Sequence, residues 1–278
     1  LEQIESARAR LGLDKPLPVQ YGIFIRDVLH GNFGKSYIYG KPAMDLIFER
    51  MPATLELVAV AACLVLCIAI PLGVYAGAYP KRASSKLIMS GSILGISLPS
   101  FWVGMMMIYI FAVVLRLLPA SGRGNTVMVG NVALSIFAPG GIRYVILPAI
   151  TLALTNVATM LRLTRSGILE NMRQDYIKFA RAKGVPAKSI LFGHALKNAL
   201  IPVVTIFGMD LGNMIAFTTI TETIFAWPGM GKLLIDAINK SDRPIIVAYL
   251  MAAACMFVVL NFIVDILYTL IDPRIELR

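Results

Sequence analysis

Charged side chains are scarce in this chain. Only 15% of its 278 residues are Asp, Glu, Lys or Arg, whereas a soluble domain carries about 25%. The mean hydropathy is +0.75 and 58% of the residues are hydrophobic. Together these values exclude an ordinary soluble domain and place the chain in the membrane class.

Cysteine and histidine are also rare, which argues against a metal or redox centre. The three cysteines, Cys63, Cys67 and Cys255, all fall within apolar runs. Cys63 and Cys67 lie one helical turn apart, but no histidine or acidic residue stands near them to complete a site, so apolar packing is the favoured interpretation. The two histidines, His30 and His194, lie far apart in the sequence and indicate no metal site.

Long apolar runs are the main feature that is present. Each approaches or exceeds the roughly 20 residues that an α-helix needs to cross a bilayer. The runs cover residues 53–78, 87–115, 144–161, 199–221 and 245–271. They predict an all-α membrane protein with five visible transmembrane helices. Pro99 and Pro148 lie inside two of these runs and are expected to kink the helices.

The distribution of Lys and Arg sets the predicted orientation. Within about 15–20 residues of a span end, thirteen basic residues lie on one side and nine on the other. The positive-inside rule then places the 79–86 loop, the 162–198 connection and the tail 272–278 in the cytoplasm. It places residues 1–51 outside and leaves 52–271 as the transmembrane domain. We expect the native product to carry a sixth, more N-terminal helix that exports residues 1–51.

The 162–198 connection, here called the coupling segment, is unusually basic for a link between two spans. It carries eight Lys and Arg against two acidic residues. Residues 176–183 lack Gly and Pro and predict a helix. Gly184 suits the position just past the end of that helix, with Pro186 two residues further on. A second helix is expected over 187–198.

Small residues near this turn indicate a surface that another protein can approach closely. Ile177, Ala180 and Gly184 are spaced to form one helix face. The alternative is a solvated basic loop that only fixes topology and touches anionic lipid.

Two blocks of the coupling segment resemble a known motif. Residues 180–184 read Ala-Arg-Ala-Lys-Gly, and residues 195–202 read Ala-Leu-Lys-Asn-Ala-Leu-Ile-Pro. Both are similar to the EAA loop of bacterial ABC importer permeases, in its dipeptide/oligopeptide-type form. The Glu-Ala-Ala triplet is incomplete, because Lys178 and Phe179 occupy its first two positions and only Ala180 matches. Further resemblance to the same family covers residues 11–21, 31–37, 50–57, 222–231, Asp265 and 271–274.

The resemblance implies the transmembrane domain of a type I ABC importer in the bacterial inner membrane. The implied partners are a homologous second permease, two cytoplasmic ATP-binding subunits, a periplasmic substrate-binding protein and membrane lipid, with no nucleic acid. No catalytic, cofactor or metal site is expected in this chain, and the partner ATPases would bind ATP and Mg²⁺. The implied solutes are di- or oligopeptides, or else nickel chelates, glutathione or opines. The implied ATPase-coupling residues are Tyr176, Ile177, Ala180, Arg181, Ala182, Lys183, Gly184 and Pro186.

Charged residues at membrane depth are costly, so they are functional candidates by default. Glu56 is expected to line the pathway, to snorkel to the membrane interface, or to pair with a nearby basic residue such as Arg50. Asp210 lies near the centre of its span with Asn213 on the same face, and the alternative for this pair is an interhelical hydrogen-bond cluster. The family usually has Gln at position 210 and Gly-Gly at 216–217. A carboxylate there would favour cationic groups such as a peptide's amine, and Phe217 is a candidate apolar gate.

The sequence also bears on three alternatives: a nucleotide site, an intramembrane protease and a secondary transporter. Residues 229–232 read Gly-Met-Gly-Lys, but a phosphate-binding loop would also need Gly at 226 and Ser or Thr at 233, where Ala226 and Leu233 stand. An intramembrane protease would need a Ser/His, paired Asp or zinc-ligand set, which the spans lack. A proton-coupled secondary transporter is the distant alternative, and it would need a more extensive relay than Asp210 and Glu56.

Overall fold

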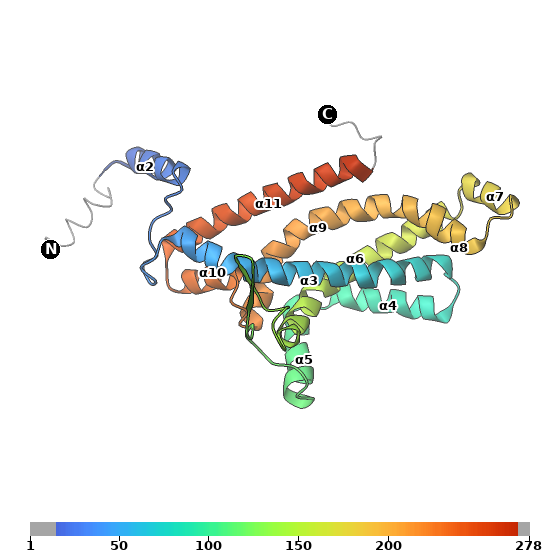
Figure 1. Ribbon diagram of the computed structural model, residues 1–278, viewed down its shortest axis with the longest axis horizontal. Coiled ribbons are helices and arrows are strands. Elements are labelled where there is room, and N and C mark those ends of the chain that lie inside the picture. Colours follow the sequence, from blue (N-terminus) through green and yellow to red (C-terminus); the bar gives the residue numbers. More distant parts are fainter. Residues whose placement is uncertain (1–14, 272–278) are drawn as a thin grey trace.

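The structure is a computed structural model that describes residues 15–271, except for the side chains of Asp265 and residues 267–271. The resembling residues 11–14 and 272–274, and the side chain of Asp265, therefore lie outside the described part. Long helices run lengthwise beside one another and form the body of the molecule (Figure 1). The short helix α7 lies at one end of this bundle, and α2 and α10 lie at the other.

The described elements are almost all helical. The connection of residues 115–141 is here called the outer loop. Before it come α2 (Leu17–Leu29), α3 (Ala43–Ala78), α4 (Ala83–Ser97), α5 (Ser100–Met107) and the π-helix η1 (Ile108–Val114). The outer loop holds one antiparallel hairpin of β1 (Val127–Val129) and β2 (Val132–Leu134), in which Val127 pairs with Leu134. The remaining elements are α6 (Ile142–Asn171), α7 (Asp175–Ala182), α8 (Ala187–Ser189), the π-helix η2 (Ile190–Ala195), α9 (Leu196–Ile224), α10 (Met230–Asn239) and α11 (Arg243–Ile271).

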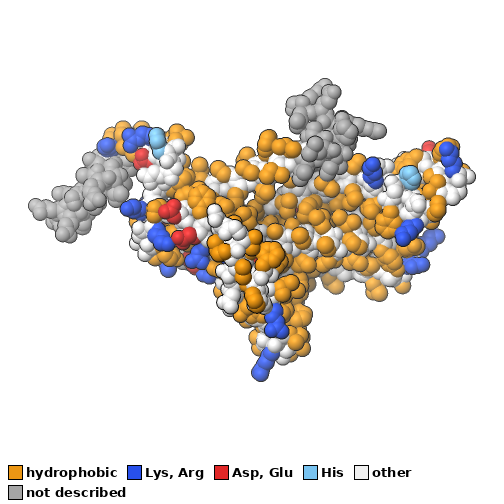
Figure 2. All heavy atoms as spheres, viewed as in Figure 1, with side chains coloured by type: hydrophobic (Ala, Val, Ile, Leu, Met, Phe, Trp, Pro, Cys, Tyr) orange, Lys and Arg blue, Asp and Glu red, His pale blue; other side chains and the backbone are white. Residues whose placement is uncertain are grey.

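Four continuous helices within residues 15–271 are long and apolar enough to cross a membrane. They are Ala43–Ala78, Ile142–Asn171, Ala187–Ile224 and Arg243–Val264. The pair Ala83–Ser97 and Ser100–Val114 is also apolar enough but is bent by 105°, and it adds a fifth crossing if the two helices together form one span. Figure 2 shows hydrophobic side chains over the middle of the bundle and charged ones gathered toward its ends, as a lipid-facing belt requires.

The predicted run 87–115 is therefore two helices joined at a sharp bend and not one kinked helix. Leu98 has an extended backbone with ψ 130°, and the pyrrolidine ring of Pro99 disfavours the helical conformation for the residue before it. The segment α5 then leaves the bundle axis nearly at a right angle (Figure 1). Pro148, by contrast, lies within the uninterrupted α6.

One predicted helix boundary is wrong. The second helix of the coupling segment does not end at residue 198, because α8, η2 and α9 together form one helical span from Ala187 to Ile224. The polar start of this helix extends beyond its apolar part, so the change in composition does not mark its boundary. The predicted start of the transmembrane domain at residue 52 lies inside α3, which begins at Ala43 and continues through Pro52.

Small residues allow the central helices to approach closely. A Cβ on Gly73 would lie 2.6 Å from Thr164 Cβ, and one on Gly77 would lie 2.7 Å from Ile168 Cβ. The main core contains buried residues of α3, α6 and α9 together with Trp227. Close backbone approach of this kind is the usual basis of helix association in membranes, and it holds α6 in place beside α3.

Candidate functional site

A cavity of about 320 Å³ opens between α6 and α9, midway along both helices. It is here called the central cavity. Ser100, at the break between α4 and α5, completes its wall. The lining residues are Ser100, Thr151, Leu152, Thr155, Asn156, Thr159, Asp210, Asn213, Met214, Phe217 and Thr221.

The structure brings three of the four pathway candidates to this cavity. Asp210, Asn213 and Phe217 share one face of α9, because their spacing of three and four residues follows the helical repeat. Phe217 is 62% exposed and Asp210 is half-buried. Their transport roles stay predictions, since the geometry places these side chains together without showing a solute.

The other wall of the central cavity was missed by the sequence analysis. Thr151, Thr155 and Thr159 recur every four residues along α6 and therefore face the same side. Asn156 adds an amide beside them. The signal that would have found this wall is a polar stripe at helical spacing inside an otherwise apolar span.

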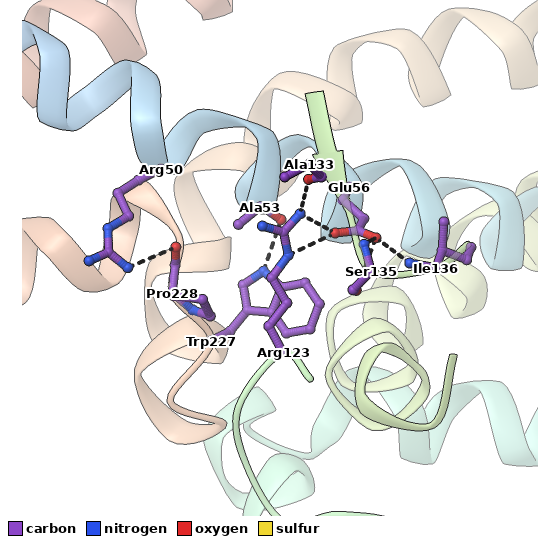
Figure 3. Close-up of polar contacts among 9 residues, drawn as sticks. All are labelled: Arg50, Ala53, Glu56, Arg123, Ala133, Ser135, Ile136, Trp227 and Pro228. Atoms are coloured by element: carbon purple, nitrogen blue, oxygen red, sulfur yellow. Dashed lines mark hydrogen bonds and ion pairs between the residues drawn. The ribbon is translucent and has the colours of Figure 1, made fainter. Parts of the chain in front are cut away.

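Glu56 does not line the central cavity. Its carboxylate is 5% exposed and accepts hydrogen bonds from Arg123 Nε at 2.9 Å, from Ser135 N at 2.6 Å and from Ile136 N at 2.7 Å (Figure 3). The predicted pairing with Arg50 is wrong, because Arg50 instead donates to the carbonyl of Pro228 at 3.5 Å.

We call Glu56, Arg123, Ser135 and Ile136 the outer clamp. Arg123 Nη2 also donates to Ala133 O at 2.6 Å, and its guanidinium lies 5.7 Å from the Trp227 ring. The outer clamp thus ties the hairpin loop to α3 by a buried ion pair. The partner was not predictable from spacing, because Arg123 lies 67 residues from Glu56 and reaches it only after the outer loop folds back.

The glycine-rich turn before α10 is filled by a carboxylate of the chain itself. Glu222 accepts hydrogen bonds from Thr54 Oγ1 at 2.7 Å and from Lys232 N at 2.9 Å. A Cβ on Gly229 would lie 2.2 Å from Glu222 Oε1, and one on Gly231 would lie 2.6 Å from Thr219 Cα. These glycines therefore make room for Glu222 and for α9, and the turn has no space for a phosphate group.

The coupling segment begins with a well-formed helix and turn. α7 spans Asp175–Ala182, and Gly184 follows with φ +77°. Gly184 N donates to Arg181 O at 3.0 Å and Val185 N donates to Ala180 O at 3.1 Å, which together form a Schellman motif. The predicted helix and its glycine end are confirmed.

Two of the three residues of the predicted small-residue face, Ile177 and Ala180, point into the chain's own core. Ile177 is 0% exposed and packs with Ile168 of α6 and with Ile190 and Ala199 of the following helical span, and Ala180 packs against the same cluster. Ile177 is therefore not available for contact with a partner, whereas Gly184 is exposed.

The outward surface of α7 has a different composition. Phe179 is 62% exposed and Tyr176 is 40% exposed. Lys183 Nζ lies 4.5 Å from the centre of the Phe179 ring. In the sequence, Phe179 stands out only as a departure from the Glu-Ala-Ala triplet. An aromatic residue on the polar side of an amphipathic helix is itself a signal of an interaction surface. The predicted contact residues Arg181, Ala182, Lys183, Gly184 and Pro186 are all exposed.

Tyr176 joins α7 to both helices that line the central cavity. Its hydroxyl donates to Asn171 Oδ1, at the end of α6, at 2.8 Å. It also accepts from Asn198 Nδ2, near the start of α9, at 3.0 Å. A displacement of α7 would therefore pull directly on α6 and α9 through these two hydrogen bonds.

Comparison with known proteins agrees with this architecture. The transmembrane chain of the inward-facing MetNI methionine ABC transporter superposes with a TM-score of 0.63 at 16% identity, over 82% of this chain and 97% of that one. A second structure, of an amino acid ABC transporter, superposes with a TM-score of 0.53 at 14% identity. The fold is thus that of an ABC transporter transmembrane domain.

Sequence comparison then identifies the family. The family model for the inner membrane component of binding-protein-dependent transport systems matches residues 69–277. The probable D,D-dipeptide transport system permease protein DdpB of Escherichia coli (strain K12) is 38% identical over 98% of this chain and 84% of its own length. The oligopeptide transport system permease protein AppB of Bacillus subtilis (strain 168) is 40% identical over 96% of this chain and 83% of its own. This chain belongs to that family of inner membrane permease components, and the resemblance found in its sequence is confirmed.

Proposed function

We propose that this chain is one permease subunit of an ATP-driven importer and forms half of the translocation pathway for di- or oligopeptides. In this proposal α7 docks on a cytoplasmic ATPase subunit, a homologous permease supplies the other half of the pathway, and a periplasmic binding protein delivers the solute. The named relatives that transport dipeptides and oligopeptides support the choice of solute class. The chain itself catalyses no reaction, and ATP and Mg²⁺ belong to the ATPase subunits.

The connection between α7 and the central cavity carries the proposal. The inner face of α7 is fastened to α6 and α9 by the Ile177 cluster and by Tyr176, while its outer face is exposed. A rigid element with one face anchored and the other available can transmit a partner's movement. ATP-driven approach of two ATPase subunits would pull on α7 and thereby change the separation of α6 and α9. The work of the chain is then a difference in interaction free energy between its inward and outward states.

The test uses the assembly purified through a tag on this chain and reconstituted with its binding protein. Phe179→Ala removes the exposed aromatic ring of α7 without touching the Ile177 cluster. Because central aromatic residues often dominate interfaces, we expect a loss of about tenfold or more in solute-stimulated ATP hydrolysis. Peptide uptake into proteoliposomes should fall in parallel.

The matched control is Phe137→Ala. Phe137 is 65% exposed and lies in the outer loop, far in sequence from α7. It should leave solute-stimulated ATP hydrolysis unchanged. If Phe179→Ala retained full coupling in a correctly assembled complex, the docking role of α7 would be wrong.

A further inference from the structure

We propose that the central cavity recognises a cationic hydrogen-bond donor of the transported solute, such as the protonated N-terminal amine of a peptide. The inference rests on the proposed function, because it assigns a chemical preference to the same pathway. It is carried by the side chains that line the cavity and by the hydrogen bonds that three of them, Thr151, Asn156 and Thr159, donate within α6.

The formal charge of the cavity wall is negative. Asp210 contributes a carboxylate. Among the residues described by the structure, no lysine, arginine or histidine lines the cavity. A solute group that carries a negative charge would therefore meet a like charge without a compensating cation, whereas a positive group would be attracted.

Two of the three threonine hydroxyls that α6 contributes to the cavity are turned into acceptors. Thr151 Oγ1 donates its hydrogen to Leu147 O at 2.9 Å, and Thr159 Oγ1 donates to Thr155 O at 3.2 Å. A hydroxyl group has one hydrogen and two lone pairs. Once the hydrogen is used within the helix, the oxygen can only accept from a group in the cavity.

The amides of the wall lie beside these hydroxyls. Asn156 Nδ2 donates to Leu152 O at 3.3 Å within α6, so one of its two amide hydrogens is used within the helix and its side-chain oxygen can still accept. Asn213 lies one helical turn from Asp210 along α9 and lines the same cavity.

These residues together form a wall that offers acceptors beside one carboxylate. An ammonium group carries three hydrogens and a charge, and it has no lone pair to meet such a wall unfavourably. The apolar lining residues Leu152, Met214 and Phe217 offer contact for the uncharged part of a solute. Hydrogen bonds to charged groups are stronger than neutral ones, so Asp210 would supply most of the discrimination.

The experiment measures uptake by the reconstituted complex with its own binding protein. The probes are two equimolar tripeptide libraries, one with free amino termini and one with acetylated amino termini, and accumulated peptides are quantified by mass spectrometry. The quantity of interest is the ratio of free-amine to acetylated uptake. Because the same binding protein is present throughout, a change in this ratio between variants reports on the permease and not on delivery.

We expect Asp210→Asn to lower that ratio about tenfold relative to the wild type, since a charge-assisted hydrogen bond is lost. Asp210→Glu should largely restore the ratio. The matched control is Asp236→Asn, which makes the same chemical change on α10, outside the central cavity. There Lys232 Nζ lies 2.8 Å from Asp236 Oδ2. It should leave the ratio unchanged.

The outcomes separate this inference from the proposed function. An unchanged ratio in Asp210→Asn, or an equal fall in the uptake of both libraries, would overturn the inference and favour an interhelical role for Asp210 and Asn213. A wild-type complex that accumulates neither library would instead overturn the proposal of a peptide importer.

Discussion

The outer clamp and the central cavity each place a carboxylate in the membrane domain, but they use it differently. The two oxygens of Glu56 are occupied by Arg123, Ser135 and Ile136, and the residue is 5% exposed. Asp210 is half-buried, borders the central cavity and makes no ion pair within the described residues. Charge at membrane depth alone does not identify a pathway residue. The completeness of its hydrogen bonding separates a structural carboxylate from an available one.

Removal of the Glu56 carboxylate should have the largest effect. Glu56→Ala leaves the Arg123 side chain, which is 11% exposed, buried without its partner, and breaking such a pair costs about 3–5 kcal/mol. The midpoint of thermal unfolding, followed by tryptophan fluorescence of the complex in nanodiscs, should fall clearly. Arg123→Ala should act similarly, and the double variant should lose less than the sum. A stable Glu56→Ala protein with altered solute selectivity would contradict the assignment of Glu56 as a structural carboxylate.

The glycine turn beside the outer clamp should be the next most sensitive position. Gly229→Ala would place a methyl group 2.2 Å from Glu222 Oε1, and such overpacking costs about 1–3 kcal/mol. The control is Gly91→Ala in α4, where nothing lies within 4 Å of the added Cβ. Thermal unfolding should distinguish the two variants. Equal stability would mean that the turn shifts without strain.

Asp210→Asn sharpens the comparison from the other side. Because Asp210 is half-buried and makes no ion pair within the described residues, we expect unfolding to change by less than about 1 kcal/mol. The same preparation should show the altered uptake ratio described above. A large loss of stability would place Asp210 with Glu56 among the structural carboxylates.

An exposed carboxylate on α7 gives the smallest expected effect. Lys178 Nζ donates to Asp175 Oδ1 at 2.8 Å, and this bond lowers the pKa of Asp175. A lowered folded-state pKa stabilises the fold above the ordinary Asp value of about 3.9 and loses that contribution as the pH falls through the lower value. Stability should therefore not respond to this pair between pH 5 and 8. An NMR titration should show the pKa of Asp175 rising in Lys178→Ala, and no rise would mean that the pair is not formed in solution.

Much of the membrane architecture was predictable because its determinants are local. Apolar run length marked five spans, and the structure has four continuous helices and one bent pair in those places. The end of α7 was predictable because Gly184 can adopt a left-handed backbone that other residues avoid. The identity of Asp210, Asn213 and Phe217 as neighbours followed from helical spacing within one span.

The failures share a different cause. The partner of Glu56, the inward direction of Ile177 and the threonine wall opposite Asp210 all depend on which elements pack together. An amphipathic helix has one apolar face, but its sequence does not say whether that face meets another chain or its own core. For α7 the answer came from α6 and the long span that begins at Ala187.

The amino-acid sequence by itself determined that this protein is a helical membrane protein with a basic connection between two apolar spans, because hydrophobic length, charge bias and helix-ending residues act within short segments. Only the tertiary structure decided that the Glu56 carboxylate is buried and hydrogen-bonded and that the Asp210 carboxylate borders the central cavity. That distinction requires residues as far apart as Glu56 and Arg123, or Thr151 and Asp210, to meet. Such meetings are set by the packing of whole helices, and no local pattern encodes them.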